Sequence, residues 1–455
     1  MTLQSSRLHE LDNPDLSVNN RAELCCEIAK EFENKGEYED ARKTLSRYWP
    51  HIGEHPEVAE LEPLAAGEVL LRAGVLTGFI GSTNQIADAQ EKAKDLIFRS
   101  LSIFQSLGQQ EKIAEAQTEL ALCYWRAGEN NEARTLLGEA LSQLTVDSEL
   151  RAKAVLRLAI VEIAASESEK ALSILTDHES LFQQLANHTL KGSYHITLGN
   201  VLKNLWETEA RTEYLDRAVV EYAAASYHFE LAEHRTYLAN VQNNLGLLYL
   251  MINRCEEAHR HLDYARRLLE SLKDVTGVAQ VDESRACVFL KQDRAAEAER
   301  IVRSAVDTQE QSGRQALLAE ALITHGRALA RLEDYSAALT AFRRAIHVSE
   351  RTGDRNRAAE AAFAAFEEMG QHLAILEGEK LVSGRTLNEE ISSFEHDTIK
   401  LALENAKGSV TRAARSLDLS HQALAYIIET RHKDLLKYMK PPRRRSQIKI
   451  KKDKK

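Results

Sequence analysis

The distribution of proline constrains the fold of this chain more than any other feature of its sequence. The chain has 455 residues and six prolines, and none of these prolines lies between Pro63 and Pro441. Proline is excluded from helix interiors but is common in the turns of mixed folds. The proline-free stretch is also rich in Ala, Leu, Glu, Arg and Gln, which favour helices. The sequence therefore predicts an all-α body.

One five-position pattern recurs through this stretch. Small, bulky, small, bulky and small residues follow one another at offsets of 3, 9, 4 and 3. Ungapped copies begin at Ala29, Ala121, Gly246, Ala286 and Gly326, two copies with a longer loop between their helices begin at Ala73 and Gly199, and a weak copy begins at Ala159. Such a pattern predicts antiparallel helical hairpins, because small residues let two helices approach closely while large ones fill the space beside them.

This pattern resembles the tetratricopeptide repeat (TPR). The resemblance covers about residues 22–352, in about eight units. It implies a superhelical solenoid that binds a protein or peptide partner. Residues 1–21 are then expected to form an N-terminal segment, and residues 353–393 a capping helix followed by a glycine-containing linker.

In TPR proteins, fixed positions on the first helix of each unit line a concave groove. By this resemblance the groove residues include Asn200, Asn240, Asn243 and Asn244. An asparagine amide both donates and accepts hydrogen bonds, which suits binding to a peptide main chain. The other units carry Glu, Thr or Ser at one equivalent position, so the asparagines do not form a continuous ladder.

A separate module is expected over residues 394–433. The pattern predicts a first helix over about Glu395–Asn405, a second helix capped by Ser409, and a third helix capped by Ser420. Gly408 suits the end of the first helix, and Asp418 begins the tight turn before the third. This order of helices and turn is that of a helix-turn-helix.

The module resembles the Fis-type helix-turn-helix, the DNA-binding domain of many bacterial activators. The matching residues are Gly408, Ser409, Val410, Thr411, Ala413, Ala414, Leu417, Leu419, Ser420 and Leu424. The resemblance implies that the start of the third helix faces the major groove of double-stranded DNA, and that the second helix approaches phosphates. Positive charge usual in the family at Tyr426 and Ile427 is displaced to Arg431 and Lys433. The expected DNA-binding residues are Thr411, Arg412, Arg415, Ser420, His421, Gln422, Ala423, Tyr426, Arg431 and Lys433.

The net charge of −10 conceals an asymmetry between the C-terminus and the rest of the chain. Residues 431–455 hold twelve lysines and arginines but two aspartates, a net charge of +10, so the remaining residues carry −20. Residues 434–455 lack a core-forming pattern and are expected to be a disordered basic tail. Such a tail indicates an anionic partner, for which it would supply non-specific affinity.

Two classes of function fit these features. The leading hypothesis is a cytoplasmic, nucleoid-associated bacterial transcriptional regulator that binds DNA through the module and a protein or peptide through the TPR array. The alternative is an interaction scaffold whose basic end docks on RNA, a ribosome or an anionic surface. DNA binding also predicts a homodimer paired through residues 355–405, because one small module buries little surface and related modules read two half-sites.

The sequence carries no signature of an enzyme, a cofactor or a metal site. The five cysteines are scattered without CxxC spacing, and the 16 histidines include no HExxH motif. Gly74, Gly78 and Gly81 lack the lysine of a phosphate-binding loop, so a long turn within the second unit is expected there. No apolar run approaches the roughly 18 residues of a membrane span, and no secretory signal is evident, so no membrane partner is expected.

Overall fold

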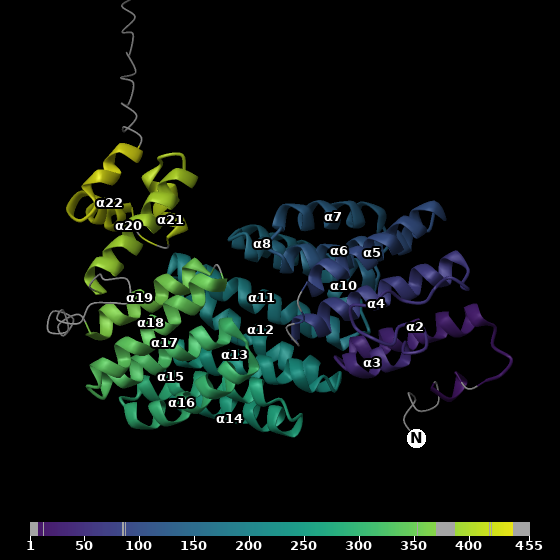
Figure 1. The fold of residues 1–455 in the computed structure, drawn as a ribbon, viewed down its shortest axis with the longest axis horizontal. Coiled ribbons are helices and arrows are strands. Elements are labelled where there is room, and N and C mark those ends of the chain that lie inside the picture. Colours follow the sequence, from purple (N-terminus) through teal and green to yellow (C-terminus); the bar gives the residue numbers. More distant parts are fainter. Residues whose placement is uncertain are drawn as a thin grey trace, which may run out of the picture. The chain divides into compact units, whose positions relative to one another are not determined.

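The fold was obtained as a computed structural model and is all-helical. The structure describes residues 8–11, 13–83, 86, 88–352, 354–369, 387–417, 419 and 421–439, and none of these residues forms a β-strand. Figure 1 shows successive helices arranged as hairpins. The chain divides into two compact units, Met1–Arg314 and Gln315–Lys455.

The first unit is a series of helical hairpins, each made of a first and a second helix. The first helices are α2 (Val18–Asn34), α4 (Pro63–Thr83), α6 (Gln110–Arg126), α8 (Glu149–Ala164), α11 (His188–Glu209), α13 (Arg235–Met251) and α15 (Val275–Lys291). The second helices are α3 (Tyr38–Thr44), α5 (Ala89–Ser106), α7 (Asn130–Gln143), α9 (Ser168–Asp177), α12 (Thr212–Leu231), α14 (Cys255–Ser271) and α16 (Ala295–Ser312). A short helix, α10 (Glu179–Gln184), follows the fourth hairpin.

The second unit contains the eighth hairpin and the C-terminal module. The hairpin consists of α17 (Gln315–Arg331) and α18 (Tyr335–Thr352), and α19 (Arg355–Met369) packs against both helices. Buried alanines of α19, such as Ala361 and Ala364, form part of the core, so the expected capping helix is present. The module contains α20 (Leu387–Asn405), α21 (Val410–Ser416), α22 (His421–Thr430) and the 3₁₀ helix η2 (Lys433–Tyr438).

The small positions of the repeated pattern are where the two helices of a hairpin touch. A Cβ atom added at Gly246 would lie 2.5 Å from Cγ of Leu262 and 3.3 Å from the carbonyl oxygen of Ala258. A Cβ at Gly199 would meet the ring of Tyr222 at 2.8 Å. The prediction of hairpins held together at small residues is therefore confirmed.

The second hairpin differs from its prediction in two respects. The glycine that meets the second helix is Gly74, one residue after the expected Ala73, since a Cβ there would lie 2.6 Å from Ile97 and 3.2 Å from the Ala93 carbonyl oxygen. The expected long turn around Gly78 and Gly81 is helical instead, because α4 continues to Thr83. Gly81 permits this continuation, since a Cβ there would overlap the side chain of Ala89.

The fifth hairpin also accommodates its extra residues within helices rather than in a longer loop. Helices α11 and α12 have 22 and 20 residues, and only Ala210 and Arg211 connect them. Ala210 reverses the chain with a left-handed φ of 55°. The expectation of a lengthened loop was wrong, because the additional residues extend both helices.

Within the first unit, the first hairpin contacts the fifth and sixth. The Thr189 hydroxyl donates a hydrogen bond to the Asn34 carbonyl oxygen at 3.4 Å. Gly36 has a left-handed φ of 76°, and a Cβ there would lie 2.7 Å from Cε1 of His234. This close approach requires glycine. Residues that are far apart in the sequence consequently share one surface at this contact.

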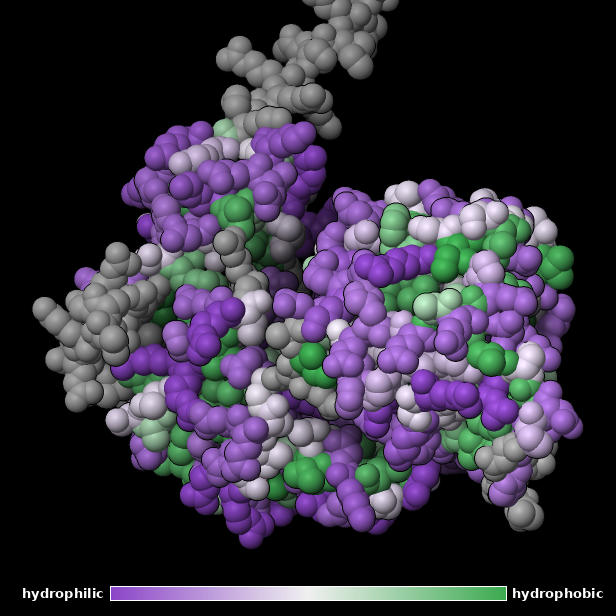
Figure 2. Space-filling view, turned by 45° about the vertical axis from the view of Figure 1, so that its right-hand side comes forward, coloured by the Kyte–Doolittle hydropathy of each residue, from purple (hydrophilic) through white to green (hydrophobic). Residues whose placement is uncertain are grey.

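The surface and the core follow the sequence pattern. On the face in Figure 2, hydrophilic residues predominate and hydrophobic ones form separate small patches. The expectation that no apolar run approaches the length of a membrane span was wrong. Among the described residues one segment, Pro63–Gly81 of α4, is long and apolar enough to cross a membrane, but 83% of its apolar window is buried inside the protein. The burial of this segment shows that α4 is a core helix of the first unit. The five cysteines are free, and three of them are buried.

Candidate functional site

The C-terminal module has its own hydrophobic core. Leu403 of α20, Leu424 and Ile428 of α22, and Leu435 of η2 are fully buried in one cluster. Helix α20 starts at Leu387, earlier than the predicted Glu395, and η2 adds Leu435 to the core. The predicted module of residues 394–433 is therefore too short at both ends. Residues 434–439, which were assigned to the tail, belong to the module.

The first helix of the module ends in a glycine-containing turn, as the sequence predicted. Lys407 and Gly408 both have left-handed φ angles, and the Gly408 amide donates to the Leu403 carbonyl oxygen at 2.7 Å. Ser409 occupies the N-cap position of α21 as predicted, although its side chain makes no capping hydrogen bond. Ser420, the expected cap of α22, lies outside the described residues, as do Asp418 and residues 440–455 of the expected tail.

Helix α22 presents a polar face opposite its core contacts. Leu424 and Ile428 are one turn apart and fully buried, which fixes the rotation of the helix. Gln422 and Tyr426 consequently lie on the opposite side of the helix and are exposed, Tyr426 at 66%, whereas His421 lies on the core side and is exposed because it is the first residue of α22. Ala423, which was expected to face DNA with them, is half-buried.

The residues predicted to contact phosphates differ in whether their side chains already bind another group of the protein. Thr411, Arg412 and Arg415 are exposed on α21. Arg412 donates to the Ala406 carbonyl oxygen at 3.0 Å, whereas Arg415 has no ion pair with any residue in the described ranges.

The two basic residues after α22 show the same contrast. Arg431 is paired with Glu395 at 3.2 Å, whereas Lys433 is exposed at the start of η2. Arg415 and Lys433 are therefore the more available cations of the predicted set.

Two histidines that the sequence interpretation did not consider fasten α20 to the end of the module. Nε2 of His432 lies 2.7 Å from Oε2 of Glu395, and His432 is 4% exposed. His396 lies between Asp397 and Asp434, at 2.9 and 2.7 Å. The hydrogen bonds that His396 donates to Asp397 and Asp434 raise its pKa. No short motif marks these residues, because they come together only when η2 folds back on α20.

The predicted groove asparagines have different environments. Asn240, Asn243 and Asn244 lie on α13, with Asn240 exposed and Asn244 half-buried. Oδ1 of Asn200 on α11 accepts a hydrogen bond from the Tyr222 hydroxyl at 2.6 Å, which gives it a structural role. Asn243 is 8% exposed, and its Oδ1 has no hydrogen-bond partner among the described residues. A buried acceptor without a donor is costly, so Asn243 is the best ligand contact of the four.

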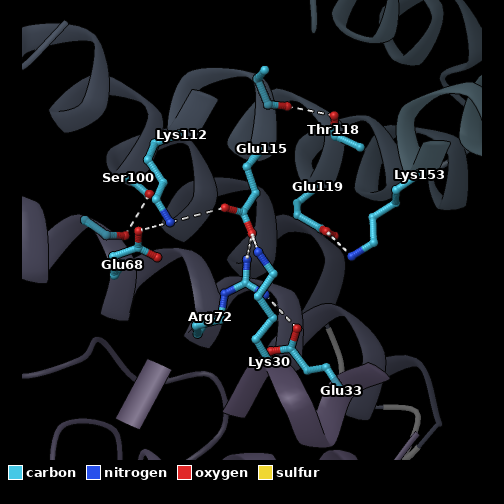
Figure 3. A network of polar contacts seen from close by, with 12 residues as sticks. Lys30, Glu33, Glu68, Arg72, Ser100, Lys112, Glu115, Thr118, Glu119 and Lys153 are labelled. Atoms are coloured by element: carbon cyan, nitrogen blue, oxygen red, sulfur yellow. Dashed lines mark hydrogen bonds and ion pairs between the residues drawn. The ribbon is translucent and has the colours of Figure 1, made fainter. Parts of the chain in front are cut away.

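The first helices of the first four hairpins carry an ion-pair network that the sequence interpretation missed (Figure 3). Its centre is Arg72 of α4, which is 1% exposed. The Arg72 guanidinium binds Glu33 at 2.6 Å and Glu115 at 2.9 Å. Lys30 also binds Glu115, at 2.7 Å, and Lys112 pairs with Glu68. The network thus connects α2, α4 and α6.

The network continues from α6 to α8. Glu119 of α6 is 2% exposed and is bound by Arg157 at 2.6 Å and by Lys153 at 3.3 Å. Glu119 has its pKa lowered to about 2, because these cations outweigh the effect of burial. Burial dominates at Glu33 and raises its pKa, although Arg72 opposes this. The pKa values of the Glu33 and Glu119 carboxylates are therefore shifted in opposite directions.

A sequence signal for this network exists in the spacing of its charges. Successive first helices carry charged pairs four residues apart, which places both side chains on one helix face. The pairs are Glu68 and Arg72, Glu115 and Glu119, and Lys153 and Arg157. The signal was hidden because the second copy of the pattern was placed at Ala73 instead of Gly74. With the corrected position, all three pairs occupy equivalent places in their units.

Comparisons with known proteins support the fold. No model of a protein family and no curated protein matches the chain. A crystal structure of a Rap protein complexed with Competence and Sporulation Factor is 13% identical and matches with a TM-score of 0.57, over 77% of this chain and 92% of that one. The apo form of the quorum sensor NprR from B. thuringiensis is 11% identical, with a TM-score of 0.54 over 76% of this chain and 92% of that one. The human IFIT1 dimer with PPP-AAAA is 13% identical, with a TM-score of 0.50 over 76% of each chain.

These likenesses and the hairpins of the structure agree on the fold. The chain is an all-α, TPR-like solenoid of helical repeats. At such low sequence identity the likeness concerns the fold alone.

Proposed function

We propose that this TPR-like solenoid is a DNA-binding transcriptional regulator whose C-terminal module acts as a Fis-type helix-turn-helix. The observation that carries the proposal is the polar first turn of α22, where His421 and Gln422 are exposed just before the buried Leu424 and Ile428. Recognition helices enter the major groove by their N-terminal residues. Arg415 and Lys433 are exposed, and they are the cations that would contact phosphates in this proposal. The protein acts in the cytoplasm and has no catalytic activity.

The TPR array binds a peptide or protein partner in this proposal. The Oδ1 of Asn243, which lacks a hydrogen-bond partner within the described part of the chain, supports it, because a main-chain amide of an extended ligand would supply the missing donor. Asn240 and Asn244 lie on the same helix and offer further amide groups. The Rap structure contains Competence and Sporulation Factor, and NprR is described as a quorum sensor, which is consistent with a ligand-responsive array here.

Binding of the full-length protein to duplex DNA, measured by fluorescence anisotropy over a range of salt concentrations, tests the proposal. Arg415→Ala should weaken binding to every duplex and lower the slope of log K against log salt by roughly 0.9, the value of one phosphate contact. Arg300→Ala, which removes an exposed arginine of α16, is the matched control and should change neither quantity. Equal binding to single-stranded RNA, unaffected by Arg415→Ala, would favour the interaction scaffold instead.

A further inference from the structure

A buried histidine lies in the contact between the first hairpin and the sixth. His234 is 2% exposed and is the N-cap residue of α13. Its ring faces Gly36, in the turn between α2 and α3, where an added Cβ would lie 2.9 Å from Nε2 of His234. On the side of its own hairpin, the ring stacks on Tyr237, with the centroids 3.9 Å apart and an angle of 5° between the planes. The His234 ring therefore fills the interface between two hairpins that are far apart in the sequence.

The hydrogen bond of His234 and its burial both require the neutral form of the ring. Nδ1 of His234 accepts from the Tyr237 amide at 3.3 Å and so caps the N-terminus of α13. An imidazole nitrogen accepts a hydrogen bond only while it carries no proton. Protonation of Nδ1 would therefore place two N–H groups against each other and leave the helix uncapped. Burial also lowers the pKa of His234 to about 4.

The described residues around His234 provide no counter-charge for a protonated ring. Its contacts are aromatic, with Phe229 of α12 and Tyr237 of α13, and it has no ion pair with any described residue. Tyr38 of the first hairpin also lies nearby, and burial first and Tyr237 second raise its pKa. The charged residues next to the contact in the sequence are all exposed, and they are Lys35, Glu37, Glu233 and Arg235. The contact thus disfavours the charged form of His234.

A pair of histidines lies at a second anchor point of the first hairpin. There the Thr189 hydroxyl of α11 donates to the carbonyl oxygen of Asn34, the last residue of α2. His188, the residue before Thr189, faces His228 of α12, with the two Nδ1 atoms 3.0 Å apart. One of these nitrogens must donate and the other accept, so both cannot carry protons while the pair persists.

The neighbours of His228 also oppose its protonation. The titratable side chains around it are His188, Lys191 and His195 of α11 and Tyr227 of α12. His195 stacks on His228, with the centroids 5.5 Å apart, and is itself bound by Glu221 at 2.7 Å. Burial first, and then the charges of the three α11 residues, lower the pKa of His228 to about 4. Both anchor points of the first hairpin therefore depend on neutral histidines.

We propose that the contact of the first hairpin with the fifth and sixth is a pH-sensitive switch, which neutral His234 and His228 keep closed and which acid opens. Opening separates the turn between α2 and α3 from the start of α13, while the core inside each hairpin stays packed. The inference does not depend on the proposed function.

The direction of the pH effect follows from the lowered pKa values. In the open arrangement water reaches both rings, which then titrate near the ordinary histidine pKa of 6.5. The contact is therefore fully stabilised above about pH 6.5 and loses this stabilisation as pH falls towards 4. Between these limits the equilibrium constant for closing falls by roughly tenfold per pH unit for each histidine.

Hydrogen exchange of the full-length protein, corrected for the intrinsic rate, measures this equilibrium. Protection of residues 235–240 at the start of α13 should fall between about pH 7 and pH 5 by roughly 20-fold for each histidine. His234→Asn should remove one share of this fall, because asparagine keeps a capping acceptor but does not titrate in this range. Adding His228→Gln should remove the remainder. His347→Asn, which changes an exposed histidine of α18, is the matched control and should respond to pH as the wild type does.

A pair of glycine variants tests the geometry without changing any titratable group. Gly36 and Gly128 occupy equivalent turns, with left-handed φ angles of 76° and 82°, but a Cβ at Gly128 would meet nothing within 4 Å. Both alanine variants carry similar backbone strain. Gly36→Ala should lower the protection of residues 235–240 already at pH 7, whereas Gly128→Ala should leave it unchanged.

Several results would overturn the inference. They are equal protection of residues 235–240 at both pH values, a full wild-type fall in the double histidine variant, and equal protection in the two glycine variants. An equally large fall in α17 and α18 would show general unfolding in acid, which also contradicts a local switch. If His234→Asn does not fold at pH 7, the pH dependence of the wild type and the glycine pair still decide the question.

Discussion

Arg72 is the residue on which the first three hairpins depend most directly. Its guanidinium is buried between two carboxylates from different helices, Glu33 of α2 and Glu115 of α6. Burial disfavours the charged form of Arg72 and by itself would lower its pKa. The two carboxylates outweigh the effect of burial and raise the pKa of Arg72. The pairing therefore keeps a charge in the interior that would otherwise be excluded.

Replacing Arg72 by methionine should strongly destabilise the protein. The change leaves Glu33 and Glu115 buried without their shared cation, which typically costs about 3–5 kcal/mol. Urea unfolding of the full chain measures the effect. Arg254→Met, which breaks the exposed pair with Glu257, is the control and should leave the unfolding midpoint nearly unchanged. A midpoint for Arg72→Met equal to that of the control would contradict the structural importance of the network.

Two glycines in helices should respond oppositely to the same substitution. Gly246→Ala places a Cβ 2.5 Å from Leu262 and should destabilise the protein by about 1–3 kcal/mol through overpacking. A Cβ added at Gly138 of α7 would meet nothing within 4 Å, so Gly138→Ala should stabilise the protein by about 0.5–1 kcal/mol through helix propensity. Thermal unfolding of both variants checks the prediction. Changes of the same sign would show that the hairpins do not meet at Gly246.

At the scale of elements, the sequence predicted the hairpins well because their rule is local. Small residues at fixed spacing are sufficient to identify where two consecutive helices touch. Helix ends were less predictable. The chain around Gly78 and Gly81 reads as a turn, yet it remains helical, and α5 approaches Gly81 so closely that a Cβ there would overlap Ala89. The Arg72 network joins separate hairpins, and the spacing of its charged pairs becomes regular only once the second copy of the pattern is placed at Gly74.

The attachment of η2 to α20 should depend on pH. The pKa of His396 is raised by Asp397 and Asp434, so protonated His396 stabilises the folded module and this contribution is lost as pH rises through the raised pKa. The lowered pKa of Asp434 means that its contribution is lost only at much lower pH. Hydrogen exchange in residues 433–439 of the full chain, corrected for the intrinsic rate, should therefore be faster at about pH 8 than at about pH 6.

A matched variant separates this effect from a general loss of stability. His396→Gln should abolish the difference between the two pH values within η2 while leaving exchange in the hairpins of the first unit unchanged. If the wild-type segment exchanges equally at both pH values, the pairing of His396 with Asp434 does not hold η2 in solution.

At the scale of the whole molecule, the DNA-binding hypothesis predicts a dimer. One three-helix module buries too little surface for tight specific binding, and proteins of this type read two half-sites with two-fold symmetry. α19, within the region expected to pair, exposes Phe363 and Phe366, at 55% and 49%. Analytical ultracentrifugation should give twice the 51.1 kDa mass of one chain. Phe363→Ser with Phe366→Ser should give monomers, and a wild-type monomer that persists on DNA would contradict the prediction.

The central claim is that the chain reads DNA sequence through α22, and selection from random duplex DNA tests it most directly. The full-length protein should enrich a motif with two half-sites about one helical turn apart. A variant with His421→Ala and Gln422→Ala should lose the motif while retaining its non-specific affinity for DNA. Recovery of no motif by the wild type, or of the same motif by that variant, would contradict the account.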